Sequence, residues 1–438
     1  MGHNGTTVED GKTISRNKLL LFLLSVYIVL SCLSPKVGFI GHLEINLDDF
    51  LLLVIVFVSF MISAQMENIQ MPPQQIVAAF WGLLLVLLLS TLYSSLTKYQ
   101  LISMDGVIHE IARLFKYFLI FIAFWFAGRC GRWKETLTKI FIYSSLIVVV
   151  IGFMQTVNLF GINEVIYRYY KPMWATDPTV RLLGIQRVAS TFFNPNVLGV
   201  FLLMPFAICI SRAMLHQNRI RNTILSVIFF SGVLVTQSRT AFIGSILVIG
   251  IVWLIIRKRA HAVEKNKTAA VAIIILLFIT AIILVSRLNL IRTTDIYYSE
   301  VSVQVRLEVL EENGSKVLQK SPLLGFSPIN QPEKALDNEY LWSLYYSGLL
   351  GLLFYAFFLY AIYKNLPKNL DSLNIALAAV FIVFLIVNLT LTTFYAEKIY
   401  AFYIILYGIS FDVTCTSSEI FARDLSLEKN APVEVIEA

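Results

Sequence analysis

The stretch Leu336-Asp-Asn-Glu-Tyr-Leu-Trp-Ser-Leu-Tyr-Tyr-Ser-Gly-Leu-Leu-Gly351 joins a polar part of the chain to a long apolar run. The polar part, Arg287 to Asp337, has apolar runs on both sides. Unpaired backbone groups and charged side chains are too costly in hydrocarbon, so such an insert has to lie in water or in a water-filled cavity. We therefore expect the chemistry of the protein in this insert.

The composition indicates a polytopic membrane protein. Of the 438 residues, 57% are hydrophobic and 14% are charged, and the mean hydropathy is +0.74, which is too apolar for an ordinary soluble domain. The net charge of +7 does not indicate nucleic acid, because the basic residues cluster in short connections between apolar runs, as the positive-inside rule describes. The four cysteines are scattered, without the spacing of a zinc site or a disulfide framework.

Apolar windows of about twenty residues recur along the chain, and they predict an all-α fold with about twelve membrane-spanning helices. The last window is shorter than a full crossing needs and is equally compatible with a helix in the membrane interface. Basic residues precede the first window and follow most of the even-numbered windows, although the connection after the second window has none, and this pattern predicts that both termini are cytoplasmic. The windows are 18–34, 46–64, 76–96, 107–127, 137–158, 194–213, 222–237, 239–257, 268–286, 340–363, 372–392 and 398–413.

These windows predict five parts of the chain. Residues 1–17 form a cytoplasmic tail, 18–286 carry helices one to nine, and 287–338 form a large extracytoplasmic loop. Residues 339–413 carry three further helices, and 414–438 form a second cytoplasmic tail. Within the loop, the periodicity predicts an amphipathic helix from Val303 that ends at Ser321-Pro322.

Arginines on the predicted outer face suggest a site for an anion. They are Arg181, Arg187, Arg239 and Arg306. A guanidinium presents a planar fork of donors and keeps its proton, so it suits a phosphate or pyrophosphate. Converging arginines would form an anion cradle at the membrane surface, whereas each one alone is equally explained as a residue that contacts lipid phosphates.

Two polar motifs flank helices at this face. Asn194-Pro195-Asn196 predicts a helix start, with an Asn cap and Pro in the first turn, and an exposed helix N-terminus also holds anions. Asp337-Asn338-Glu-Tyr340 begins the next long apolar run. Asp337 either caps that helix or directs a carboxylate at a sugar hydroxyl, as a general base requires.

Charges inside the apolar runs are interpreted as structural. Glu110 and Arg113 are three residues apart and can pair along one helix face, with Lys116 a turn further on. Asp48 and Asp49 either position a cationic partner or cap a helix. No histidine lies in the Asp337 motif or pairs with another, and no acidic cluster on the outer face suggests a divalent ion, so the sequence predicts no metal site.

The ordered set of motifs resembles the O-antigen ligase and polymerase superfamily of bacterial envelopes. The resemblance covers about residues 181–353. It rests on Arg187 with Thr191-Phe-Phe-Asn-Pro-Asn196, on Ser238-Arg239-Thr-Ala, on Arg306 followed by Ser321-Pro-Leu-Leu-Gly325, and on Asp337-Asn-Glu-Tyr340 before Gly348.

The resemblance implies a GT-C-like membrane glycosyltransferase of the bacterial inner membrane. Its substrates would be polyprenyl-pyrophosphate-linked glycans, as both donor and acceptor, and it would act without a metal or other cofactor. A chain-length regulator and the lipid bilayer are the further partners implied. Ligases of the family usually have a histidine at the position of Asp337, and this departure favours a Wzy-type polymerase of O-antigen, capsule or exopolysaccharide.

The candidate catalytic residues are Asp337, Arg187, Arg239 and Arg306, and the candidate substrate-binding residues are Arg181, Asn194, Asn196, Asn338 and Tyr340. Two other functions remain compatible with the sequence: the ligase of the same superfamily, and a transporter or flippase of the lipid-linked glycan. Transporters tend to place ionisable groups near the midplane, whereas these candidates crowd one face.

Overall fold

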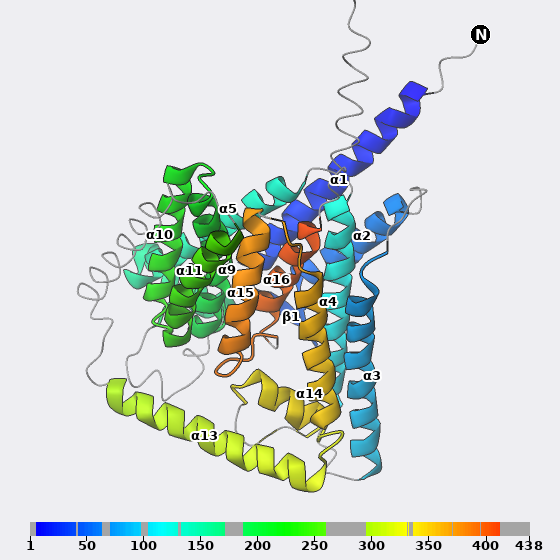
Figure 1. The fold of residues 1–438 in the computed structure, drawn as a ribbon, viewed down its shortest axis with the longest axis vertical. Coiled ribbons are helices and arrows are strands. Elements are labelled where there is room, and N and C mark those ends of the chain that lie inside the picture. The colour runs from blue at the N-terminus through cyan, green and yellow to red at the C-terminus, as the bar shows by residue number, and fades with distance from the viewer. Residues whose placement is uncertain are drawn as a thin grey trace, which may run out of the picture.

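The computed structural model describes residues 6–40, 43–63, 71–97, 104–129, 133–170, 187–259, 295–330, 332, 336–369, 371–394 and 396–411. Within these residues the chain is mainly helical (Figure 1). The elements are α1 (Thr6–Leu33), β1 (Lys36–Ile40), β2 (Leu43–Asn46), α2 (Leu47–Ser63), α3 (Gln74–Leu96), α4 (Asp105–Arg129), α5 (Lys134–Thr156), the 3-10 helix η1 (Leu159–Gly161), α6 (Ile162–Tyr170), α9 (Pro195–Met214), α10 (Arg219–Val235), α11 (Arg239–Arg259), α13 (Asp295–Lys320), α14 (Glu339–Asn365), α15 (Ser372–Val387) and α16 (Glu397–Ser410).

Helices α9 and α16 lie in the interior of the bundle. All residues of α9 from Leu198 to Met214 are buried, as are all residues of α16 from Ile399 to Ser410. A helix that is apolar on every side is stable when other helices surround it. The window 398–413 is thus a buried 14-residue helix, and protein rather than lipid determines its environment.

The outer surface of the bundle is apolar. Helix α2 exposes Phe50, Leu53 and Phe57, and α3 exposes Trp81 and Leu85, each by about half or more of its surface. An apolar surface of this extent is unfavourable in water and suits contact with lipid tails. Among the described residues, six helices are long and apolar enough to cross a membrane: Gln74–Leu96, Asp105–Gly128, Lys134–Thr156, Pro195–Met214, Arg239–Lys258 and Glu339–Asn365.

The helical pattern agrees with the sequence wherever the structure describes it. Every predicted window in the described ranges contains a helix, although Lys18–Leu33 and Ser372–Val387 are shorter than a full crossing. The window 268–286 lies outside the described residues, so the predicted count of about twelve spans stays a prediction. Helix α1 starts at Thr6, inside the segment predicted to be a tail.

The described residues agree with the predicted all-α class, and one connection contains a short β-hairpin that the sequence did not predict. Strands β1 and β2 pair antiparallel between α1 and α2. The segment between the two apolar windows is too short to show the alternation of apolar and polar residues that would predict these strands. A short connection at the end of two spans can satisfy its backbone groups by pairing with itself, which is what this hairpin does.

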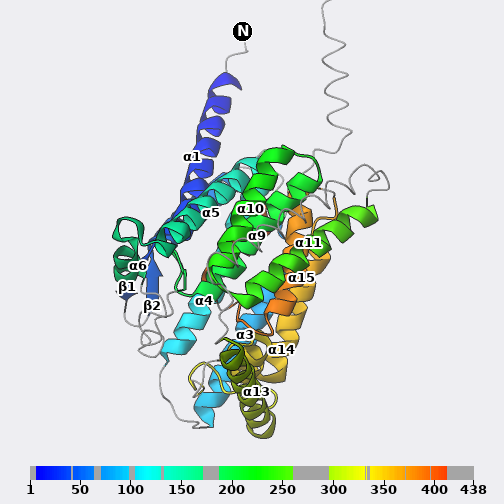
Figure 2. The ribbon, with the colours of Figure 1, turned by 90° about the vertical axis from the view of Figure 1, so that its left-hand side faces the viewer.

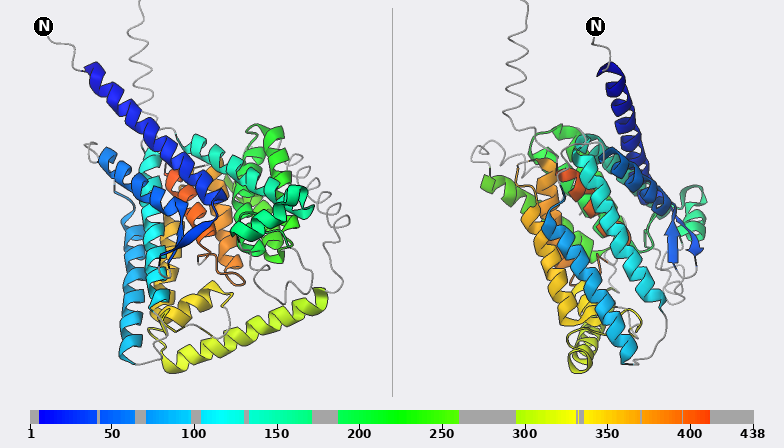
Figure 3. Two further views of the ribbon diagram at one scale, coloured as in Figure 1. Left: turned by 180° about the vertical axis from the view of Figure 1, so that it is seen from behind. Right: turned by 90° about the vertical axis from the view of Figure 1, so that its right-hand side faces the viewer.

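Helix α13 lies across one end of the bundle, and the N-terminus of α1 points away from the other end (Figures 1 and 2). The predicted amphipathic helix ends at Lys320 as expected but begins eight residues earlier than Val303, at Asp295. Val309 and Val317 on its inner face are buried against Leu336, Leu341 and Tyr345. Views from behind and from the other side show α13 at the end of the bundle where the lower ends of α14 and α3 lie (Figure 3).

Helix α14 changes direction at Gly348, where φ is 64° and ψ is −162°. The N-terminal part of α14 lies near α13, and the longer C-terminal part runs beside α3 (Figure 1). Gly348 interrupts the helix and lies so close to the segment after α13 that a Cβ would come within 2.4 Å of the backbone of Leu323. A positive φ is readily adopted by glycine and costs other residues free energy.

The segment after α13 satisfies the backbone groups that this break exposes. The amides of Leu349 and Leu350 donate to the carbonyls of Pro322 and Leu323, at 2.8 and 3.1 Å. The amides of Phe326 and Ser327 donate to the carbonyls of Tyr345 and Tyr346, at 2.8 and 3.0 Å. Because α13 leads directly into this segment, these four hydrogen bonds fix α13 relative to α14.

Candidate functional site

Arg306 and Asp337 form an ion pair at the α13 end of the bundle. The Nε atom of Arg306 lies 3.6 Å from Oδ2 of Asp337, and the two side chains are 38% and 54% exposed. A charge-assisted hydrogen bond between such groups is usually about 2.7–2.9 Å long. This longer, exposed contact adds little to stability. The pair therefore presents a guanidinium and a carboxylate side by side at a surface that a ligand can reach.

Asn338, and not Asp337, caps helix α14. Its side-chain oxygen accepts hydrogen bonds from the amides of Tyr340 and Leu341, at 2.9 and 3.0 Å. The capping interpretation of Asp337 was wrong by one residue, because the residue with extended backbone geometry at the helix start is Asn338. Asp337 is left exposed beside Arg306, which is compatible with its other predicted role.

The loop between α15 and α16, residues 388–394, contacts both helix α11 and Asn338, which precedes α14. The amide group of Asn338 donates to the carbonyl of Leu389 at 3.1 Å. On the next residue, the hydroxyl of Thr390 lies 3.2 Å from the hydroxyl of Thr240. Thr240 follows Arg239, which is exposed at the first position of α11. A continuous set of contacts therefore leads from Arg306 through Asp337 to the turn that carries Arg239.

Arg187 binds the same turn from the other side. Its guanidinium donates to the carbonyl of Thr236 and to that of Gln237, each at 3.2 Å. It also donates to the side-chain oxygen of Asn196 at 2.7 Å. Arg187 thus ties the start of α9 to the α10–α11 turn, so much of its donor capacity supports the loop that presents Arg239.

The predicted cap of α9 is confirmed. The side-chain oxygen of Asn194 accepts from the amide of Asn196 at 2.8 Å, and Pro195 occupies the first helical position. The hydroxyl of Tyr340 donates to the carbonyl of Leu385 at 2.7 Å, which binds α14 to α15. Both side chains therefore have internal partners at the site. Arg181 lies outside the described residues.

The site is surrounded by helix N-termini. Helices α9, α11 and α14 begin at Pro195, Arg239 and Glu339, and their first turns adjoin the contacts described above. At Gly199 the first turn of α9 lies so close to α11 that a Cβ would come within 2.7 Å of that of Ala241. Helix N-termini carry partial positive charge and unsatisfied amide donors. Together with the guanidinium groups, they make this end of the bundle attractive to an anion.

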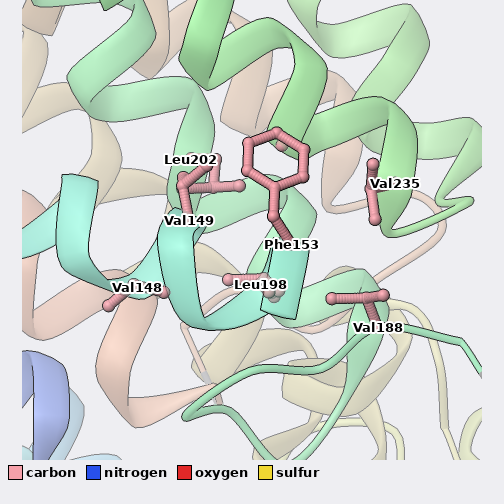
Figure 4. Close-up of a pocket in the computed structure, with 9 residues that line it drawn as sticks. Val148, Val149, Phe153, Val188, Leu198, Leu202 and Val235 are labelled. Atoms are coloured by element: carbon pink, nitrogen blue, oxygen red, sulfur yellow. The ribbon is translucent and has the colours of Figure 1, made fainter. Parts of the chain in front are cut away.

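An apolar recess lies next to Arg187. Val149 and Phe153 of α5, Leu198 of α9 and Val235 of α10, together with Val188, line this small apolar recess, which is open to solvent and has room for a group no larger than a water molecule (Figure 4). Val188 follows Arg187 in the chain, and Val235, also in the lining, precedes Thr236, whose carbonyl binds Arg187. An apolar surface and a cationic group thus meet at one place.

Sequence reasoning did not identify the loop 388–394 or Glu339 as parts of the site. The loop is the polar end of an apolar run, with Asn388, Thr390, Thr392 and Thr393 in close succession. That cluster was a usable signal, because several hydrogen-bonding side chains between two membrane helices need partners. Glu339 was assigned only to a helix start, although it is 1% exposed.

Fold and site together define a multi-pass helical membrane protein with paired arginine and carboxylate groups at one mouth of the bundle. Within it, residues 224–356 match a family model described as O-antigen ligase. This match confirms the resemblance to the O-antigen ligase and polymerase superfamily, whose members are glycosyl-transfer enzymes. The matched residues include Arg239, Arg306 and Asp337, and Arg187 precedes them. No curated protein was found to match the chain.

Proposed function

We propose that this protein is a membrane glycosyltransferase that polymerises polyprenyl-pyrophosphate-linked oligosaccharide repeats. It acts at the outer face of the bacterial inner membrane and produces O-antigen, capsule or exopolysaccharide. The observation that carries the proposal is the exposed Arg306–Asp337 pair, linked through Thr390 to the Arg239 turn, within the residues that match the family. Both termini lie on the cytoplasmic side, and α13 covers the end of the helix bundle at the outer face of the membrane.

Arg239 and Arg306 bind the pyrophosphate of the donor in this proposal. As the bond between the sugar C1 and the pyrophosphate oxygen breaks, negative charge grows on the leaving group. Preorganised guanidinium groups and helix N-termini stabilise that charge where little water is present. Arg187 holds the Arg239 turn in place through Thr236 and Gln237 and contributes to the same positive field. This arrangement supplies the electrostatic stabilisation without a metal.

Asp337 accepts the proton of the attacking hydroxyl group of the acceptor sugar. The hydroxyl oxygen forms the new bond to C1, and the polyprenyl pyrophosphate leaves with the electron pair of the broken bond. In the resting protein Arg306 contacts Asp337, and pyrophosphate binding offers Arg306 a stronger partner. The carboxylate then has an oxygen available within reach of the acceptor, as general-base catalysis requires.

The apolar recess beside Arg187 supports a lipid-linked substrate. Its exposed apolar lining would contact the polyprenyl chain at the surface, without enclosing an isoprene unit, while the diphosphate meets the guanidinium groups. Burying apolar area in this way contributes about 25 cal/mol per Å². A free sugar nucleotide has no comparable apolar part, so the recess favours the lipid-linked donor.

The function is tested with purified protein in proteoliposomes that contain one lipid-linked repeat unit. A polymerase produces a ladder of products that differ by one repeat and releases polyprenyl pyrophosphate. Asp337→Asn is the matched inactive control, because it keeps the size of an exposed side chain. No ladder with the wild-type protein overturns the polymerase assignment.

The second candidate is the ligase of the same superfamily, which the description of the matching family model favours. A deletion strain separates the two enzymes. Loss of a polymerase leaves single repeats on the lipid carrier, whereas loss of a ligase leaves full-length polymer that is not attached. Loss of polymer with single repeats confined to the inner leaflet would instead indicate a transporter of the lipid-linked glycan.

A further inference from the structure

Below the candidate site, buried charges hold the loop 388–394 from two sides. The carboxylate of Glu339 accepts a hydrogen bond from the amide of Phe394 at 3.0 Å. The guanidinium of Arg113 donates to the carbonyl of Phe394 at 2.8 Å, and the hydroxyl of Tyr117 donates to the same carbonyl at 2.7 Å. Phe394 therefore connects helix α4 to the first residue of α14.

These charges lie in a dry environment. Arg113 is 2% exposed, Glu339 is 1% exposed, and Glu110, which forms an ion pair with Arg113, is 4% exposed. The guanidinium also lies over the rings of Trp342 and Phe394, at 5.0 and 5.1 Å from their centroids. Because buried charges interact strongly and tolerate little displacement, they fix the groups that they contact.

The same loop, residues 388–394, also contacts the residues of the candidate site. The amide of Glu339 donates to the carbonyl of Asn388 at 2.9 Å, and Asn338 donates to Leu389. Thr390 contacts Thr240 beside Arg239. Asp337 lies only two residues before Glu339. If the buried carboxylate of Glu339 moved, the exposed carboxylate of Asp337 would therefore move with it. The loop is thus the shared support of Asp337 and the Arg239 turn.

We propose that Arg113 and Glu339 are positioning residues that, through Phe394, hold Asp337 opposite Arg306 and beside the Arg239 turn. They act through the loop 388–394 and do not contact the substrate. The activity part of this inference rests on the proposed glycosyl transfer, whereas the placement of Asp337 can be measured without any glycan.

The placement is measured by cross-linking in membranes. Cys32, Cys130, Cys209 and Cys415 are first replaced by alanine, and Arg306→Cys and Asp337→Cys are then introduced together. A short bifunctional thiol reagent joins the two positions at a rate that depends on how often they face each other. We expect Glu339→Ala in this background to lower the cross-linking rate by about tenfold, since a loop freed from buried partners samples many positions.

Three further variants refine the measurement. Glu110→Gln with Arg113→Met removes both charges of the ion pair and the guanidinium donor to the carbonyl of Phe394, and it should lower the rate as Glu339→Ala does. Glu339→Gln keeps an acceptor for the amide of Phe394 and should restore most of the rate. The control at a distant place is Glu135→Gln with Arg212→Met, which removes the ion pair of the buried Arg212 on α9 with the exposed Glu135 on α5, 2.6 Å apart. This control should leave the rate unchanged.

Activity is measured in the chain with its native Arg306, Asp337 and cysteines. We expect Glu339→Ala, and separately the Glu110→Gln and Arg113→Met pair, to lower kcat by about 100-fold, because small displacements of reacting groups are costly. KM for the lipid-linked donor should change by less than about threefold, since no binding group is removed. Glu339→Gln should recover kcat, and the Glu135 and Arg212 control should keep it.

The outcomes separate the two proposals. Slower cross-linking in the Glu339 and Arg113 variants, with the control unchanged, supports positioning even if the wild-type protein makes no polymer, in which case only the proposed function fails. Unchanged cross-linking in these variants overturns positioning whatever the activity. An equal loss in the control overturns it as well, because a general loss of stability would then explain the data.

Discussion

The two ion pairs near Asp337 differ in almost every physical respect. Arg306 and Asp337 are exposed and loosely paired at 3.6 Å, whereas Arg113 and Glu110 are buried, and Arg113 is also bound to a backbone carbonyl. An exposed pair can exchange its partner for a ligand at small cost, and a buried pair cannot. The comparison indicates that groups for chemistry lie where water and substrate reach, and that groups for support lie where the protein is dry.

Among substitutions in the two ion pairs, we expect Asp337→Asn to have the largest effect on the rate of polymer formation. The variant removes the proton acceptor and keeps the shape of the side chain, so the rate of polymer formation should fall by about 1,000-fold, as for other general bases. Stability should change by less than about 0.5 kcal/mol, because the side chain is exposed. Product ladders and thermal unfolding measure the two quantities. A variant with wild-type rate would exclude Asp337 as the base.

A second substitution at position 337 distinguishes between the polymerase and the ligase reaction. Asp337→His introduces the residue that ligases of the family usually have. If repeat addition is lost while transfer of finished polymer is gained, position 337 determines which acceptor is used. Loss of both reactions would mean that the choice of acceptor depends on other residues.

Removal of one guanidinium should have the next largest effect. Arg239→Ala or Arg306→Ala should each lower the rate of glycosyl transfer by about 100-fold, as does the loss of a single preorganised donor elsewhere. Insertion into the membrane should be unchanged. Arg187→Ala should also abolish long polysaccharide, and because it frees the carbonyls of Thr236 and Gln237, we expect it alone to lower stability as well.

Lysine substitutions at these positions are the controls, since lysine keeps the charge and loses the planar fork. Chain-length profiles of the polysaccharide from whole cells are the measurement. Normal chain lengths from the alanine variants at Arg187, Arg239 and Arg306 would refute the anion cradle.

A smaller effect is expected at the break in α14. Gly348→Ala puts a Cβ within about 2.4 Å of the backbone of Leu323 at a φ of 64°. A residue strained in this way destabilises a protein by about 1–3 kcal/mol, and the contact between α13 and α14 should loosen. Gly314→Ala on α13 is the matched control, because nothing lies within 4 Å of its Cβ. Thermal unfolding in detergent compares them, and equal stability would contradict the docking of α13.

The smallest effect is expected at the cap of α14. Asn338→Ala removes an acceptor for two amides and should cost about 1 kcal/mol. Asn338→Asp keeps an acceptor for the cap, loses the donor to the carbonyl of Leu389 and adds a negative charge next to Asp337. If Asn338→Asp is as stable as the wild type but less active, the bond to the loop 388–394 positions Asp337. If both variants are fully active, the loop has no influence on the exposed pair.

The sequence predicted the membrane class and most helices because burial in lipid imposes long apolar runs, which are visible without any tertiary information. It also predicted the α13 helix, the cap at Asn194 and the motifs that the family match includes. It missed the hairpin at 36–46 and the break at Gly348. Both are backbone solutions to local hydrogen bonding, and hydropathy does not encode them.

The candidate site residues could be selected from the sequence, and they stay predictions, whereas their contacts could not be foreseen. Arg187, Arg239, Arg306 and Asp337 could be selected because charged groups at the ends of apolar runs are rare and need a reason. The loop 388–394 could not be assigned as their common support, since its contacts involve backbone carbonyls and amides. Such contacts depend on how helices distant in sequence are packed, and any residue type can make them.

The sequence by itself determined that the chain is a helical membrane protein with a polar insert and arginines at one face, because the cost of charge in hydrocarbon leaves few alternatives. Only the tertiary structure decided that Asn338 caps α14 while Asp337 faces Arg306, and that Arg187 holds the turn of Arg239. It also showed that Arg113, paired with Glu110, donates to the carbonyl of Phe394 in the loop 388–394. Helix packing brings these residues together across long sequence separations, and no local pattern specifies which charge will meet which partner.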